Sequence, residues 1–82
     1  MSTKFENKMR ETTLATLIHY LVNRDKKSPM RSARHIIDAA EKSYRSSVLP
    51  QKKETLLREL SNLIHEKNEP KILNFLRSHF RQ

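Results

Sequence analysis

The stretch Ser28–Ser47, SPMRSARHIIDAAEKSYRSS, is the clearest helix in this chain of 82 residues. Ser28 can cap a helix, and Pro29 suits its first turn because proline lacks the N–H that would stay unpaired there. At about 100° per residue, one arc of this helix is apolar and the other is charged. The apolar arc consists of Met30, Ala33, Ile36, Ile37, Ala40 and Tyr44. The opposite arc consists of Arg31, Arg34, His35, Asp38, Lys42 and Arg45. We therefore expect one face to pack and the other to meet water or an anionic partner.

Three further segments repeat apolar residues at spacings of three and four, as helices with one buried face do. Together with the first stretch they predict helices over residues 4–24, 29–45, 50–66 and 69–81. Thr3 and Glu6 match a capping box for the first of these, and Asn68 or Glu69 can cap the last. The first helix also carries a second arc of Phe5, Met9 and Tyr20. That arc is available for self-association, so the sequence leaves a homodimer open.

The chain contains no glycine and no cysteine. Without glycine it cannot form a glycine-rich phosphate loop, and tight hairpin turns are disfavoured. Without cysteine it has neither disulfides nor thiolate metal ligands. Four helices joined by connectors of about three to five residues imply antiparallel neighbours. The predicted fold is therefore all-α, a single domain over residues 1–82 built as an antiparallel four-helix bundle.

The hydropathy pattern favours a cytoplasmic protein. No apolar run approaches the roughly 18 residues of a membrane span. The first residues, MSTKFENKMRE, are polar and lack the apolar core of a signal peptide. A place at the inner face of the membrane stays compatible with this pattern.

Charge is the strongest indication of function. The chain has 17 Lys and Arg residues against 9 Asp and Glu, a net charge of +8. Residues 26–49 contribute half of this surplus. Lys52 and Lys53 add two cations in the first turn of the third predicted helix, where the helix dipole disfavours them. Arg77 and Arg81 lie near the C-terminus. The candidate partner-binding residues are Lys26, Lys27, Arg31, Arg34, Lys42, Arg45, Lys52, Lys53, Arg77 and Arg81.

Catalytic and metal-binding patterns are missing from the sequence. His19, His35, His65 and His79 form no HExxH motif and no i,i+4 pair. No serine lies in a nucleophile elbow, and a domain of this size has little room for a closed pocket. We therefore expect a protein that is not an enzyme, with no cofactor, no metal and no small-molecule substrate.

Several kinds of partner fit a basic surface. One is a nucleic-acid backbone, read without base contacts because no exposed helix face combines Asn, Gln and Arg. Others are an anionic membrane surface and an acidic protein surface, as an adaptor or inhibitor would occlude. The surface can equally serve solubility alone. These alternatives stay open at the level of the residues.

The order of the helices resembles the small immunity proteins that protect Gram-positive bacteria from their own pediocin-like bacteriocins, of the enterocin A immunity type. The resemblance is carried by LATLIHYLVN at 14–23, ARHIIDAAEKSY at 33–44 and LLRELSNLIHEKNEPKILNFLRSHF at 56–80. It implies an antiparallel four-helix bundle that acts from the cytosol on a bacteriocin-engaged membrane transporter, without turnover. The contact surfaces would be the basic face of the second helix and the segment through Arg77 and Arg81. The leading expectation is thus a non-enzymatic bacteriocin-immunity protein, and the alternative is a small basic nucleic-acid-binding or regulatory protein.

Overall fold

The computed structural model describes residues 3–24 and 28–80, with side chains for residues 11–23 and 28–80. Its four α-helices are α1 (Thr3–Arg24), α2 (Pro29–Tyr44), α3 (Pro50–His65) and α4 (Glu69–Phe80). The described part of the chain contains no strand, so the predicted all-α, four-helix fold is confirmed. Over the same residues, no helix combines the length and the apolar character that crossing a membrane requires.

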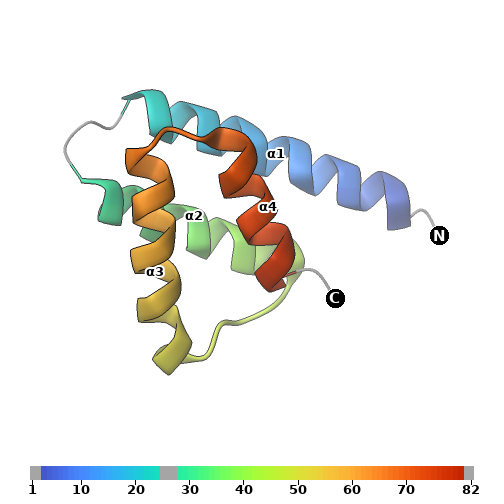
Figure 1. Cartoon of the computed structure of the whole chain (residues 1–82). Coiled ribbons are helices and arrows are strands. Elements are labelled where there is room, and N and C mark those ends of the chain that lie inside the picture. Colours follow the sequence, from blue (N-terminus) through green and yellow to red (C-terminus); the bar gives the residue numbers. More distant parts are fainter. Residues whose placement is uncertain (1–2, 25–27, 81–82) are drawn as a thin grey trace.

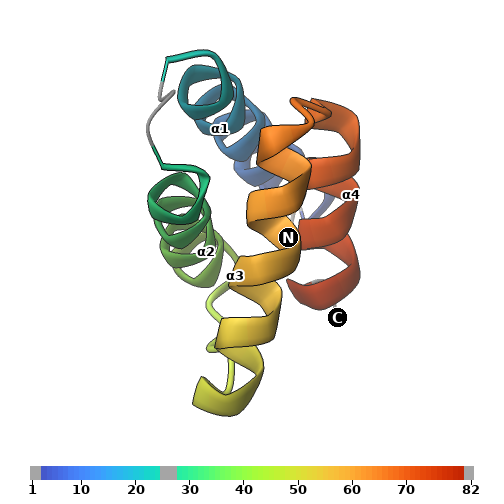
Figure 2. The same cartoon turned by 60° about the vertical axis from the view of Figure 1, so that its left-hand side comes forward.

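The four helices form two antiparallel pairs (Figure 1). Helices α1 and α2 lie along each other in opposite directions, and α3 and α4 stand across them at a steep inclination. Turning the molecule shows α3 and α4 side by side (Figure 2). Helix α1 packs on α2 and α4, and α3 packs on the same two helices. The bundle therefore differs from one whose helices all share nearly one direction.

One hydrophobic core joins all four helices. The spacings seen in the sequence place its residues on the inward faces, because positions three and four apart share a side of a helix. Helices α1 and α2 contribute Leu14, Ile18, Leu21, Val22, Ala33, Ile36, Ile37 and Ala40. Helices α3 and α4 contribute Leu56, Leu57, Leu60, Ile64, Ile72, Leu76 and Phe80. Ser32 is also buried, which the helical pattern of α2 did not predict.

Side-chain caps begin two of the helices where the sequence places them. The Ser28 hydroxyl accepts the N–H of Arg31 at 3.2 Å, and Pro29 follows in the first turn. The Asn68 side-chain oxygen accepts the N–H of Lys71, also at 3.2 Å. Each cap satisfies a backbone donor that the helix itself leaves unpaired. The Thr3–Glu6 capping box lies outside the described side chains.

Two helices end in left-handed backbone on residues other than glycine. Helix α2 stops at Tyr44, one residue before the predicted end, because Arg45 has a φ of 52°. Helix α3 stops at His65, and Lys67 has a φ of 59°. The N–H of Ser46 donates to the carbonyl of Glu41 at 3.0 Å, closing the α2 end. The predicted last residue of the fourth helix, Arg81, lies outside the described residues.

Candidate functional site: a basic face on α2 and the groove between α2 and α3

Four exposed cations line the outer side of α2, and we call them the α2 basic face: Arg31, Arg34, Lys42 and Arg45. The apolar arc of the helix faces the core, so the polar arc points outward as predicted. Within residues 11–23 and 28–80, none of the four makes an ion pair with a carboxylate. Their charges are therefore available to an anionic partner.

Lys53 has a different role from these four. Its Nζ lies 3.3 Å from Glu41 Oε1 and 3.9 Å from Asp38 Oδ1, which links α3 to α2. The other Glu41 oxygen, Oε2, accepts the N–H of Val48 at 2.8 Å. The Val48 bond, helped by Lys53, lowers the pKa of the Glu41 carboxyl below its ordinary value. Lys53 is thus largely a structural cation, whereas the neighbouring Lys52 is exposed.

Arg77 is also engaged within the protein. Its Nε and Nη2 donate to the two Glu11 oxygens at 2.8 and 3.0 Å, a bidentate pair that joins α4 to α1. This contact raises the pKa of the Arg77 guanidinium. Arg77 is therefore not part of the α2 basic face, because its guanidinium is paired with Glu11 of α1. Lys26, Lys27 and Arg81 lie outside the described residues.

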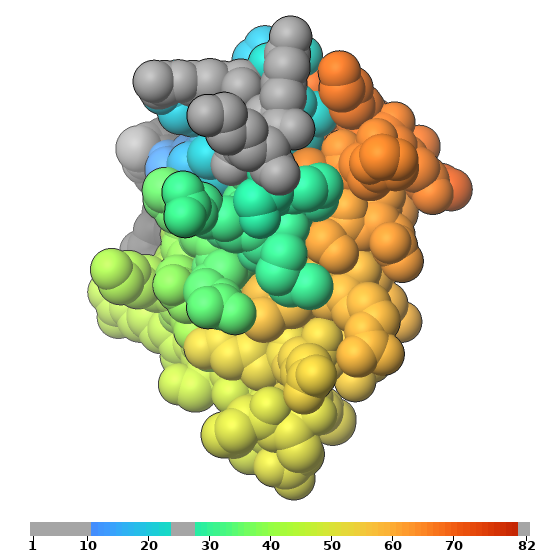
Figure 3. Space-filling model, turned by 90° about the vertical axis from the view of Figure 1, so that its left-hand side faces the viewer, coloured from blue at the N-terminus to red at the C-terminus, as the bar shows by residue number. Residues whose placement is uncertain are grey.

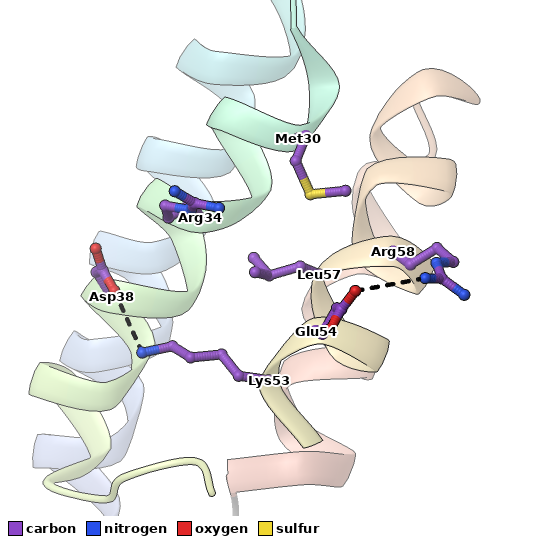
Figure 4. A pocket seen from close by; sticks show the side chains of 7 residues that line it. All are labelled: Met30, Arg34, Asp38, Lys53, Glu54, Leu57 and Arg58. Atoms are coloured by element: carbon purple, nitrogen blue, oxygen red, sulfur yellow. Dashed lines mark ion pairs between the residues drawn. The ribbon is translucent and has the colours of Figure 1, made fainter. Parts of the chain in front are cut away.

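A groove lies between α2 and α3, beside the α2 basic face. Figure 3 shows this side of the molecule, with α2 in green next to α3 in yellow and orange. This α2–α3 groove has a volume of about 520 Å³ and is lined by Met30, Arg34, Asp38, Lys53, Glu54, Leu57 and Arg58. Met30 and Leu57 point toward each other from opposite helices, and charged side chains surround them (Figure 4). Glu54 and Arg58 lie four positions apart on α3 and form an ion pair, with Arg58 Nη2 at 3.7 Å from Glu54 Oε1. The groove thus joins an apolar floor to a charged rim.

Met30 corrects one sequence-based assignment. Its place on the apolar arc predicted packing in the core, but the side chain is 40% exposed. It belongs to the first turn of α2, at the edge of the interface with α3, so the core does not cover it. The groove residues of α3 were not predicted as a site. The spacing of Glu54 and Arg58 was visible in the sequence, but their position opposite Arg34 depends on how the helices pack.

A second polar cluster connects α1 and α4. His19 Nδ1 lies 3.0 Å from Glu69 Oε1, and Asn23 Nδ2 donates to Glu69 Oε2 at 3.3 Å. In the part of the chain that the structure describes, no three His, Asp or Glu side chains gather as metal ligands would. We therefore interpret this cluster as a contact between the two helices.

The chemistry available at the α2 basic face and the groove is that of binding. Guanidinium groups match carboxylates and phosphates with two parallel hydrogen bonds, and the apolar floor can take an aliphatic or aromatic group. Compared with protein-family models, with curated proteins and with solved structures, the chain gives no significant match. The resemblance to the bacteriocin-immunity proteins therefore stays a prediction from the pattern of helices.

Proposed function

We propose that this is a non-enzymatic binding protein that recognises an acidic, membrane-associated protein target from the cytosol, as expected of a bacteriocin-immunity protein. The observation that carries the proposal is the α2 basic face, whose cations have no carboxylate partner in the described chain. Among the described side chains, most ion pairs that involve a carboxylate join two helices. Cations left over on one exposed face are the arrangement that attracts and orients an anionic surface.

The arginines of this face also suit a protein target. A guanidinium binds a carboxylate through two hydrogen bonds in a fixed plane, so it fixes orientation as well as supplying charge. Arg31 and Arg34 lie one helical turn apart on exposed positions. They can therefore engage two acidic side chains of one partner without any change of the backbone.

Expression in sensitive bacteria tests the proposal. Cells that produce the full chain should resist one member of a panel of pediocin-like bacteriocins. The variant Arg31→Glu/Arg34→Glu should lose most of the protection while its circular dichroism spectrum stays helical. The matched control is Lys67→Glu/Lys71→Glu, which changes the net charge equally on exposed residues away from α2. It should protect as the unchanged chain does.

Three outcomes would contradict the proposal or part of it. If no bacteriocin of the panel is resisted, the immunity function falls. If the α2 variant protects as fully as the unchanged chain, the contact surface lies elsewhere on the molecule. A reduction that is the same in both variants would point to net charge alone rather than to the α2 basic face.

The same four cations favour a second candidate, binding to a nucleic-acid backbone. Tyr44 of α2 is half-buried and stacks on Phe80 with ring centroids 5.8 Å apart, so its ring is not available to a base. The protein would then bind the phosphates, and the logarithm of its association constant should fall steeply as the logarithm of the salt concentration rises. A gel shift at low salt that Arg31→Glu/Arg34→Glu/Arg45→Glu abolishes would support this candidate. The absence of any shift would remove it.

A further inference from the structure

We propose that the α2–α3 groove is a docking site for an acidic amphipathic helix of a partner protein. An apolar side chain of the partner packs between Met30 and Leu57, and a carboxylate of the same helix pairs with Arg34. This inference rests on the proposed binding function and adds the chemistry of the segment that is recognised.

The apolar floor is the first observation that carries it. Ala33, Ile36, Ile37 and Ala40 of α2 are fully buried, whereas Met30 is 40% exposed at the groove. Methionine is flexible and polarisable, so it adapts to apolar groups of different shapes. The volume of about 520 Å³ suits the insertion of one or two side chains. The fold itself does not fill this place.

The charges of the rim are the second observation. Arg34 has no carboxylate partner among the described residues. Arg58 reaches Glu54 only at 3.7 Å, between side chains that are 72% and 83% exposed. Such a surface pair contributes little, so Arg58 can turn to a new partner at low cost. Arg34 on α2 and Arg58 on α3 can therefore each donate hydrogen bonds to a carboxylate of a partner.

The carboxylates of the rim select a peptide over a phosphate surface. Asp38 and Glu54 lie in the same groove as Arg34, Lys53 and Arg58. The charged groups of a nucleic-acid backbone or of an anionic phospholipid surface are phosphates, and these would be repelled by the two carboxylates of the rim. A peptide can place an amide or a lysine there. The positive and negative charges of the rim, together with the apolar floor, are complementary to an amphipathic segment.

The shape of the site favours a helix as the occupant. A second hollow, lined by Ser28, Met30, Arg31 and Arg34, shares two residues with the groove and extends it along α2. Arg31 and Arg34 are thereby presented one helical turn apart beside Met30. A helix meets such a row with side chains spaced three or four residues apart, as in other helix-in-groove complexes.

A synthetic peptide gives the direct test. The probe is a capped, alanine-based helix of about 16 residues, with two leucines at i,i+4 flanked by glutamates on the same face. Added to the ¹⁵N-labelled full chain, it should shift the amide signals of the α2 and α3 residues around the groove, with saturation. Replacing its leucines by alanine should weaken binding about tenfold, and replacing its glutamates by lysine should abolish it.

Variants of the protein complete the test. Met30→Ser and Arg34→Gln should each weaken peptide binding about five- to tenfold, and Lys71→Glu on α4 should leave it unchanged. Both groove positions are exposed, so the variants are expected to fold, which circular dichroism checks. The proposal is overturned if no saturable shift occurs at about 1 mM peptide, or if shifts map elsewhere. It is equally overturned if duplex DNA or phosphatidylglycerol vesicles occupy the groove in preference to the peptide.

The test also separates this inference from the proposed function. Protection in sensitive bacteria that survives Met30→Ser and Arg34→Gln would remove the groove proposal and leave the immunity function standing. Peptide binding in the groove without protection from any bacteriocin would remove the immunity function and leave the groove proposal standing.

Discussion

At the scale of single residues, the lack of glycine has its clearest effect at the helix ends. Arg45 and Lys67 take the left-handed conformation, with φ of 52° and 59°, where glycine is the usual residue. A residue with a Cβ pays about 1–2 kcal/mol for this backbone, because the Cβ approaches the following carbonyl oxygen. The chain therefore keeps a small conformational strain at the two places where helices α2 and α3 must stop.

Lys67→Gly is expected to stabilise the protein. The left-handed strain disappears, and part of this gain is offset by the greater freedom of glycine in the unfolded chain. The net increase in the free energy of unfolding should be about 0.5–1 kcal/mol, measured by urea denaturation. Lys67→Ala is the control, because it removes the same exposed side chain and keeps the Cβ. If both variants gain equally, the strain at this residue is not the cause.

At the scale of elements, Glu41 of α2 holds the connector between α2 and α3 in place through hydrogen bonds. Its carboxylate accepts the N–H of Val48 at 2.8 Å and the Nζ of Lys53 at 3.3 Å, so one side chain of α2 holds both the connector and the next helix. The same junction forms one end of the α2–α3 groove region, where Lys53 also reaches Asp38. This carboxylate therefore ties the connector and the first turn of α3 to α2.

The pKa of Glu41 makes this junction sensitive to acid. The pKa is lowered from 4.5 in the folded protein, first by the Val48 hydrogen bond and then by Lys53. The stabilisation is therefore fully present above the unfolded pKa and is lost as the pH falls through the folded pKa. Between about pH 6 and pH 3, the unchanged chain should lose about 1 kcal/mol more stability than Glu41→Gln. Glutamine keeps an acceptor for Val48 and removes only the charge.

Chemical denaturation across this pH range measures the difference. The control is Glu59→Gln, which changes an exposed carboxylate of α3 that has no ion pair within the described residues. Its stability should follow the pH dependence of the unchanged chain. A Glu41→Gln profile that also runs parallel to the unchanged chain would show that the charge of Glu41 does not contribute.

At the scale of the whole molecule, the net charge of +8 acts over a small body. The radius of gyration is 12.2 Å, so at low salt the cations of one side still repel those of the other. The screening length is about 20 Å near 20 mM salt and about 7 Å near 200 mM. Added salt should therefore relieve a repulsion that extends through the whole folded protein.

We expect the free energy of unfolding to rise by about 0.5–1 kcal/mol between about 20 and 200 mM NaCl. Thermal and urea denaturation at both salt concentrations measure this. In Arg31→Glu/Arg34→Glu, each substitution lowers the net charge by two, and the rise should be much smaller. A fall in stability with salt would mean that the ion pairs of Glu11, Glu41 and Glu54 outweigh the overall repulsion.

The candidate site was predictable only in part. The α2 basic face follows from the sequence because helical periodicity separates charged from apolar positions within one element. The pairing of Arg77 with Glu11 did not follow, since the two residues are 66 positions apart and meet only when α4 packs on α1. Lys53 looked like a free cation in a helix N-terminus, and its partners on α2 became visible only in the fold.

The sequence by itself determined the four helices, the side-chain caps of α2 and α4, and the inward faces that form the core. These depend on local rules: the spacing of apolar residues, Ser28 before Pro29, and Asn68 before α4. The tertiary structure decided the inclination of the two helix pairs, the exposure of Met30, and which cations stay unpaired. Those features depend on side chains from separate helices meeting in space, and local spacing places no constraint on such meetings.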